Sequence, residues 1–198
     1  MFTIKTDDLT HPAVQALVAY HISGMLQQSP PESSHALDVQ KLRNPTVTFW
    51  SVWEGEQLAG IGALKLLDDK HGELKSMRTA PNYLRRGVAS LILRHILQVA
   101  HDRCLHRLSL ETGTQAGFTA CHQLYLKHGF VDCEPFADYQ FDPHSRFLSL
   151  TLCEDMNCHE PDAAHSCIRR AAPLFITSRK RLVHRRSFHM RHKKPLFQ

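Results

Sequence analysis

Residues 84–90 read Leu-Arg-Arg-Gly-Val-Ala-Ser, and this stretch joins two segments of different periodicity. Before it, residues 73–79 have the composition of a β-strand; after it, from residue 88 to about 102, apolar residues recur at helical spacing. A turn between a strand and a helix points consecutive backbone N–H groups outward at the helix N-terminus. Those groups and the helix dipole form an anion site that suits a pyrophosphate.

The residue types in this turn fit the binding of a phosphate group. Gly87 allows the backbone to approach a ligand closely, and Ala89 lets the helix pack near that ligand. Arg85 and Arg86 supply charge-assisted contacts to phosphate oxygens. A solvated basic turn that caps a helix has the same residue types, so these residues alone leave both interpretations open.

Outward from this turn, the hydrophobic pattern predicts strands that pair through hairpins and then alternate with helices. Gly129 fits a left-handed cap at the end of the last helix. This order predicts an α/β fold with a mixed sheet. The predicted strands are 2–5, 47–53, 57–67, 73–79, 106–111, 130–139 and 146–152, and the predicted helices are 11–26, 36–43, 88–102 and 115–128.

Charge divides the chain near residue 153, where the periodicity also stops. Residues 1–153 hold 14 Lys/Arg and 15 Asp/Glu, a net of −1, whereas residues 154–198 hold 10 Lys/Arg and 4 Asp/Glu, a net of +6. We therefore expect one domain over 1–153 and a basic, poorly ordered C-terminal extension over 154–198. Nucleic acid is not the expected partner, because nothing beyond charge in the extension supports it.

The cellular location expected from the sequence is the cytoplasm. The first residues carry no basic segment followed by an apolar one, so no secretory signal is predicted. No stretch approaches the ~20 apolar residues that span a bilayer, so no membrane partner is expected. The six cysteines are then expected to be reduced, and the spacing of Cys and His over 153–167 matches no zinc module, so no metal is expected.

Tyr125 is the second candidate for chemistry. It lies on a helical stripe with Phe118 and Cys121, at successive spacings of three and four residues. From spacing alone a core tyrosine is the favoured interpretation. A functional role requires its hydroxyl to reach a cleft, where it would give a proton to a leaving group.

Together, the turn and the segment Leu-Tyr-Leu-Lys-His-Gly-Phe over 124–130 resemble the N-acetyltransferase superfamily abbreviated GNAT. The family pattern is Gln/Arg-x-x-Gly-x-Gly/Ala; Gly87 and Ala89 match it, while Leu84 stands where Gln or Arg is usual. Segments 29–32, 72–79 and 136–147 resemble a bacterial subgroup of acetyltransferases. The resemblance covers about residues 1–153. It implies a GNAT-like, mostly antiparallel central sheet with a V-shaped splay, flanked by about four helices.

The resemblance also implies a mechanism that uses acetyl-CoA as co-substrate. A primary amine attacks the thioester directly, either Glu73 as general base or a water chain takes its proton, and Tyr125 protonates the departing thiolate. An amide N–H near Met77 would stabilise the oxyanion. For Glu73, a solvent-facing strand carboxylate is the open alternative. The residues implied to bind the co-substrate are Met77, Arg78, Thr79, Arg85, Arg86, Gly87, Val88, Ala89 and Ser90.

The expected function is therefore acetyl transfer from acetyl-CoA to a primary amine of a small molecule or amino acid. The alternative is a non-catalytic acyl-CoA-binding module, or an adaptor that contacts nucleic acid through the basic extension. The sequence identifies neither the acceptor amine nor the oligomeric state, and a homodimer stays open.

Overall fold

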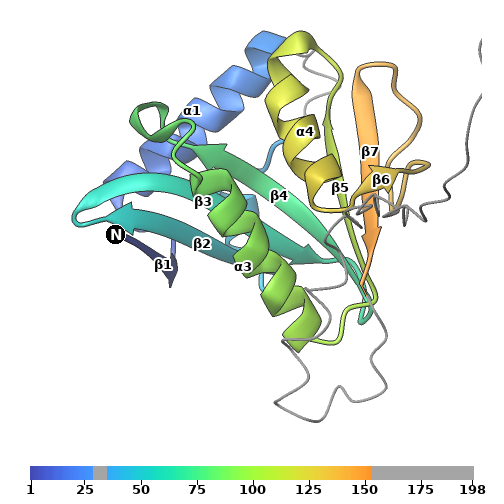
Figure 1. The fold of residues 1–198 in the computed structure, drawn as a ribbon, viewed down its shortest axis with the longest axis horizontal. Coiled ribbons are helices and arrows are strands. Elements are labelled where there is room, and N and C mark those ends of the chain that lie inside the picture. The colour runs from blue at the N-terminus through green and yellow to red at the C-terminus, as the bar shows by residue number, and fades with distance from the viewer. Residues whose placement is uncertain (29–34, 153–198) are drawn as a thin grey trace, which may run out of the picture.

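Seven strands form one sheet in the order β1-β2-β3-β4-β5-β7-β6 (Figure 1) in a computed structural model of the protein that describes residues 1–28 and 35–152. The predicted extension 154–198 and the loop 29–34 lie outside the described residues. The strands are β1 Phe2–Thr6, β2 Val47–Glu54, β3 Gln57–Leu66, β4 His71–Thr79, β5 Arg107–Gly113, β6 Val131–Asp132 and β7 Ser145–Thr151, and the α-helices of the described part are α1 Pro12–Gln28, α2 Val39–Leu42, α3 Val88–Asp102 and α4 Thr119–Lys127.

Neighbouring strands are antiparallel except for β4 and β5, which are parallel. Their pairing covers only His71–Glu73 of β4, opposite Arg107–Ser109 of β5, although both strands continue beyond it. The two strands therefore separate in the middle of the sheet. The predicted mixed, mostly antiparallel sheet with its splay and flanking helices is confirmed.

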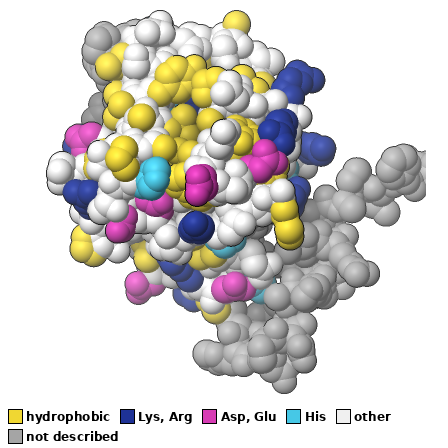
Figure 2. Space-filling model, turned by 90° about the vertical axis from the view of Figure 1, so that its left-hand side faces the viewer, with side chains coloured by type: hydrophobic (Ala, Val, Ile, Leu, Met, Phe, Trp, Pro, Cys, Tyr) yellow, Lys and Arg dark blue, Asp and Glu magenta, His cyan; other side chains and the backbone are white. Residues whose placement is uncertain are grey.

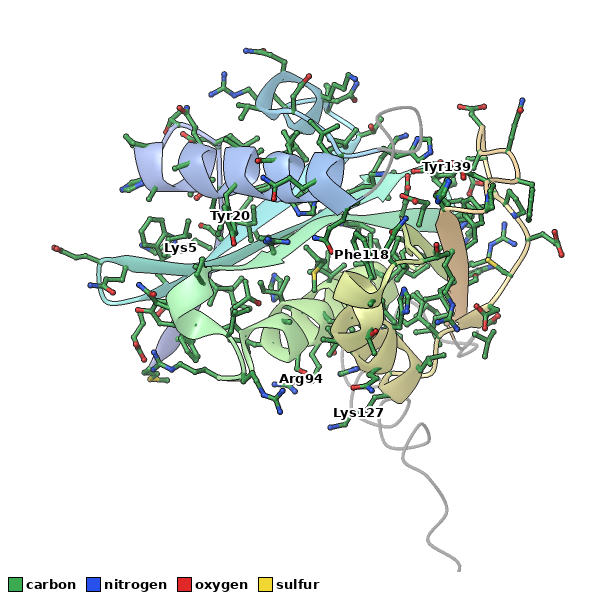
Figure 3. The ribbon with its side chains drawn as sticks, turned by 90° about the horizontal axis from the view of Figure 1, so that it is seen from above. Lys5, Tyr20, Arg94, Phe118, Lys127 and Tyr139 are labelled. Carbon is green, nitrogen blue, oxygen red and sulfur yellow. The ribbon has the colours of Figure 1, made fainter. Side chains whose placement is uncertain are left out.

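Helices cover both faces of the sheet, as the view in Figure 3 shows, with α1 on one side and α3 and α4 on the other. On the α1 face, the buried side chains of Leu17 and Val18 pack with Ile61 and Ala63 of β3. On the opposite face, Ile92 of α3 belongs to the larger apolar cluster. Successive residues of a strand point to opposite faces of the sheet, and two residues paired across adjacent strands point to the same face. The pairing partner of a residue therefore indicates its face.

A β-bulge interrupts β4 where it leaves β5. Ile61 pairs with Arg78 and Ala63 with Lys75, so Ser76 and Met77 of β4 together oppose a single residue of β3. Ser76 has φ +51, a left-handed conformation that an L-residue adopts at a cost. The extra residue shifts the alternation, and both Lys75 and Arg78 consequently face α1.

The N-terminus of α3 is fixed by a close approach to β3. A Cβ atom at Gly60 would lie 2.7 Å from Cγ1 of Val88, the first residue of α3. Only a glycine leaves room for this contact, because a real Cβ atom is not found that close to another heavy atom. The turn over residues 84–90 is thereby held beside the C-terminal end of β4.

Two predicted elements were wrong in extent. The strand predicted over 130–139 is only Val131–Asp132, because Pro135 lacks the N–H that a ladder requires. The chain then loops back toward the first half of β4, where Tyr139 contacts Glu73. The helix predicted over 36–43 is a single turn, Val39–Leu42, which Asp38 caps by accepting a hydrogen bond from the Lys41 N–H.

The surface of the described part carries charges of both signs. On the face in Figure 2, Lys and Arg side chains are interspersed with Asp and Glu. This agrees with the balanced charge of residues 1–153 and offers no continuous basic patch on that face. Among the described residues, no helix is long and apolar enough to cross a membrane.

Candidate active site

A cavity of about 730 Å³ opens where β4 and β5 separate. Its wall includes the N-terminus of α3, the second half of β4, and parts of α1, β5 and α4. The predicted site residues that line it are Met77, Arg78, Thr79, Arg85, Gly87, Val88, Ala89, Ser90 and Tyr125. Arg86 and Glu73 are not among the lining residues.

The α3 end of the cavity presents backbone donors. The first hydrogen bond of the helix runs from the Leu91 N–H to the Gly87 carbonyl, so the amides of residues 88–90 precede the intrahelical ladder. Gly87 has φ +83, and a Cβ atom added to it would meet nothing within 4 Å, so its outer side is open. Arg85, which also has a positive φ, lines the cavity beside these amides. This arrangement suits an anion.

Arg86 points away from the cavity. Its Nη2 lies 2.8 Å and 3.0 Å from the two carboxylate oxygens of Glu54, and its guanidinium lies over the rings of Phe2 and Tyr83. Of the two arginines predicted to contact phosphate, Arg85 is therefore the one at the cavity.

The edge of β4 toward the cavity has no strand partner after Glu73. Residues 74–79 pair with β3 on one side only, because β5 has already diverged. A free strand edge offers alternating N–H and C=O groups to an extended ligand. Met77 and Thr79 line the cavity along this edge.

Tyr125 enters the cavity from α4. Its side chain is 6% exposed, and its ring lies 5.7 Å from that of Phe130. Burial raises the pKa of the Tyr125 hydroxyl far above its ordinary value, so the hydroxyl keeps its proton. Burial also raises the pKa of the nearby Cys121 thiol, so the reactive thiolate is disfavoured and this cysteine is a poor nucleophile.

Glu73 is buried rather than solvent-facing. Its carboxylate is 1% exposed and accepts a hydrogen bond of 2.6 Å from the Tyr139 hydroxyl. The Lys75 ammonium lies 3.2 Å from the same oxygen and donates to the Tyr139 hydroxyl at 2.8 Å. Lys65 lies 3.9 Å from the other Glu73 oxygen, so the carboxylate of Glu73 has two cationic partners, and Lys75 reaches the cavity wall.

Glu111 of β5 is a carboxylate that the sequence analysis missed, and it lines the cavity. It accepts a hydrogen bond of 2.7 Å from the Ser145 hydroxyl. Burial raises the pKa of the Glu111 carboxyl above its ordinary value. The alternation of β5 was the available signal, because Glu111 shares a face with Ser109 while the intervening leucine packs in the core.

The α1 side of the cavity gathers further polar groups. His21 is 9% exposed, and burial together with the charges of Arg78 and Lys75 lowers its pKa to about 4. The His21 Nδ1 is buried without a hydrogen-bond partner among the described residues, and so is the Ser76 Oγ at the bulge of β4. Arg78 lies 4.7 Å from the ring centre of Tyr20, which Figure 3 labels on α1. Within the described residues, no group of His, Cys, Asp and Glu is arranged to hold a metal.

Comparison with known proteins places this geometry in a family. The sequence profile of the Acetyltransferase (GNAT) family matches residues 15–130. The chain is 97% identical over 155 residues to the Escherichia coli (strain K12) N-acetyltransferase YedL, itself named as uncharacterized, which covers 78% of this chain and 98% of that protein. It is 55% identical over 149 residues to the similarly named Bacillus subtilis (strain 168) YsnE, covering 75% and 99%.

Solved structures share the fold. A GNAT family acetyltransferase from Elizabethkingia anophelis, solved with acetyl-CoA bound, superposes with a TM-score of 0.55 at 16% identity. The match covers 76% of this chain and 98% of that one. At this identity the likeness concerns the fold alone.

We predict that the free energy of unfolding decreases as the pH is lowered from about 6.5 to about 4, in part through His21. In this range the unfolded histidine binds a proton that the folded one excludes, so acid favours unfolding. Exchange of His21 for Leu should remove about 3 kcal/mol of this pH dependence. Urea unfolding at a series of pH values measures it. Exchange of the exposed His144 for Gln is the control, and an unchanged slope in His21→Leu would contradict the prediction.

Proposed function

The chain belongs to the GNAT family and is an N-acetyltransferase, and on this premise we propose that it moves the acetyl group of acetyl-CoA to a primary amine of a small molecule or amino acid. The observation that carries the proposal is the single cavity shared by the α3 amides, the free edge of β4, Tyr125 and Glu111. Each part has a distinct task in that reaction, and the parts come from four different elements.

The described residues fit acetyl-CoA. The amides of residues 88–90 and the Arg85 side chain suit its pyrophosphate, and the unpaired edge over 77–79 suits the amides of its extended pantetheine arm. Bound there, the molecule supplies a thioester carbonyl that is open to attack. The acetyl-CoA complex of the Elizabethkingia anophelis relative supports the same use of the fold.

An amine must lose a proton before or while it attacks. Glu111 is the better-placed acceptor of that proton, because it lines the cavity and its pKa is raised by burial. Glu73 remains the alternative base, acting through a water chain, although Lys75 and Tyr139 already occupy its carboxylate. The new N–C bond forms as the C–S bond breaks, and the proton of the amine passes to the base.

The departing thiolate needs a proton in return. Tyr125 lines the cavity from α4 and keeps its hydroxyl proton until the leaving group carries negative charge. At the bulge, the backbone N–H of Met77 is the candidate donor to the thioester carbonyl oxygen.

A non-catalytic acyl-CoA-binding module is the competing proposal. It shares the α3 turn and the β4 edge but has no use for Glu111 or Tyr125. Release of free coenzyme A thiol that depends on both an amine and these two side chains separates the enzyme from the binding module.

We further propose that residues 1–153 fold as the catalytic domain, that the protein works in the cytoplasm, and that a homodimer is compatible with this site.

Exchange of Gly87 for Glu should abolish binding of coenzyme A. The new carboxylate would stand at the open side of the α3 amides, where the pyrophosphate is proposed to bind. Gly87→Asn is the matched control, because asparagine tolerates the left-handed conformation and adds no charge. Calorimetry with coenzyme A measures both variants, and an unchanged affinity in a folded Gly87→Glu protein contradicts the proposed phosphate site.

Exchange of Glu111 for Gln should lower kcat by ~10²–10⁴-fold, the usual worth of a general base. Activity of the unaltered enzyme should fall as the pH drops through the raised pKa of Glu111, and the variant should lack this acid limb. Glu73→Gln is the comparison: it leaves Lys75 without its buried partner and should mainly lower the melting temperature. If only Glu73→Gln abolishes turnover per folded molecule, Glu73 is the base.

Exchange of Tyr125 for Phe should lower kcat by ~10²–10⁴-fold and leave the affinity for acetyl-CoA nearly unchanged. The ring and its contact with Phe130 are kept, so only the hydroxyl is lost. The loss should shrink with an acyl donor whose leaving group needs less protonation. Steady-state kinetics measure it, and a wild-type kcat would remove the acid role while leaving the family assignment intact.

A further inference from the structure

Arg78 reaches the cavity on the face of the sheet that α1 covers. The bulge in β4 puts it on the same face as Lys75, three residues earlier. Its guanidinium lies against α1, 4.7 Å from the ring centre of Tyr20, and Nη2 would be 3.2 Å from a Cβ atom added to Gly24. A stacked guanidinium loses little further freedom when it binds a ligand.

No carboxylate neutralises Arg78 within residues 1–28 and 35–152. The buried carboxylate of Glu73 is engaged with Lys75 and Tyr139, and Glu111 accepts its hydrogen bond from Ser145. Arg78 thus forms neither an ion pair nor a hydrogen bond with the described residues, although a guanidinium carries five donors. The positive charge of Arg78 acts on His21, because burial and this charge together lower the pKa of that imidazole.

This charge has a consequence for an amine substrate. Amines arrive as ammonium ions, and a guanidinium stays protonated at every working pH, so Arg78 repels a simple alkylamine. An acceptor that also bears an anion turns this repulsion into attraction. Its ammonium then approaches Glu111 while its anion meets Arg78, both of which line the same cavity.

We propose, on the basis of the proposed acetyl transfer, that the acceptor is an amino acid or a related amine with a carboxylate, and that Arg78 binds this carboxylate. The planar fork of a guanidinium matches a carboxylate in two parallel hydrogen bonds. Arg78 is thereby the residue that selects the acceptor class.

Two buried polar atoms in the wall of the same cavity support the binding of a polar group there, and one of them, the His21 Nδ1, belongs to a side chain whose pKa is lowered by burial and by the charge of Arg78. The Ser76 Oγ and the His21 Nδ1 lack partners among the described residues, and both residues line the cavity and are more than nine-tenths buried. Buried polar atoms without partners are costly, so such atoms in a cavity wall point to a polar ligand group.

Matched acceptor pairs test the proposal. The full chain is assayed for thiol release with a panel of amino acids, their carboxamides and the corresponding alkylamines. For the preferred side chain, kcat/KM should favour the carboxylate over the carboxamide by roughly 10- to 100-fold, the worth of a hydrogen-bonded charge. Arg78→Gln should erase this preference with an unchanged KM for acetyl-CoA, because the co-substrate is proposed to contact residue 78 through its backbone alone. Arg78→Lys should restore part of the preference.

A matched control separates the two ends of the cavity. Arg85→Gln should raise the KM for acetyl-CoA and keep the carboxylate preference. A preference for alkylamines, carboxamides or aminophosphonates in the unaltered enzyme overturns the proposal while acetyl transfer stands. The proposal is also overturned if Arg78→Gln raises the KM for acetyl-CoA and keeps the preference for the carboxylate over the carboxamide.

Binding gives a readout that does not depend on turnover. N-Acetylated amino acids, the expected products, should bind the coenzyme A complex in calorimetry, whereas their carboxamides should not, and Arg78→Gln should remove the difference. If this binding holds and no amine is acetylated, the Arg78 site stands and the proposed reaction fails. If amines are acetylated and no carboxylate binds through Arg78, the proposed reaction stands and the Arg78 site fails.

Discussion

The site depends on the point where β4 stops pairing with β5. After Glu73 the two parallel strands diverge, and the bulge at Ser76 and Met77 turns β4 further from its neighbour. The left-handed conformation of Ser76 costs of order 1–3 kcal/mol, which the pairing with β3 on the other edge and the packing on both faces offset. In exchange, the centre of the sheet gains a free strand edge and a cavity that α1, α3, α4 and β5 all reach.

Opening a sheet at its centre also brings charged side chains into a poorly solvated space. Some of these side chains are paired with each other, and others are not. Glu73 pairs with Lys75 and, at 3.9 Å, with Lys65, and Glu73 and Lys75 share the Tyr139 hydroxyl, so removal of one partner leaves a buried charge without its counterpart. Glu111 and Arg78 keep unused hydrogen-bonding capacity at the cavity wall. In the proposed reaction, Glu111 and Arg78 contact the substrate, whereas the network of Glu73, Lys75 and Tyr139 fixes the position of β4.

The parts of the site that follow from local pattern were predictable from the sequence, and those set by the loop over 133–144 were not. The α3 turn, its glycine and Tyr125 stand in contiguous motifs whose spacing encodes their position. Tyr139 was assigned to a strand, although it folds back over Glu73 from 66 residues away, and no periodicity reports such a contact. Glu111 was overlooked for the opposite reason: its strand was predicted correctly, but the divergence from β4 that exposes it to the cavity is a tertiary feature.

The same bulge links the chemistry to the choice of acceptor. In a regular strand, Lys75 and Arg78 would point to opposite faces, and Arg78 would lie on the side of α3, where the co-substrate is proposed to bind. One inserted residue moves Arg78 to the α1 face, while Met77 takes the place facing α3, where its sulfur would lie 3.0 Å from a Cβ atom added to Gly62. A single backbone irregularity therefore gives β4 two different sides, an apolar one with Met77 toward α3 and a cationic one with Lys75 and Arg78 toward α1. In the proposed reaction, the carboxylate of the acceptor meets the second side, and the thioester lies against the first.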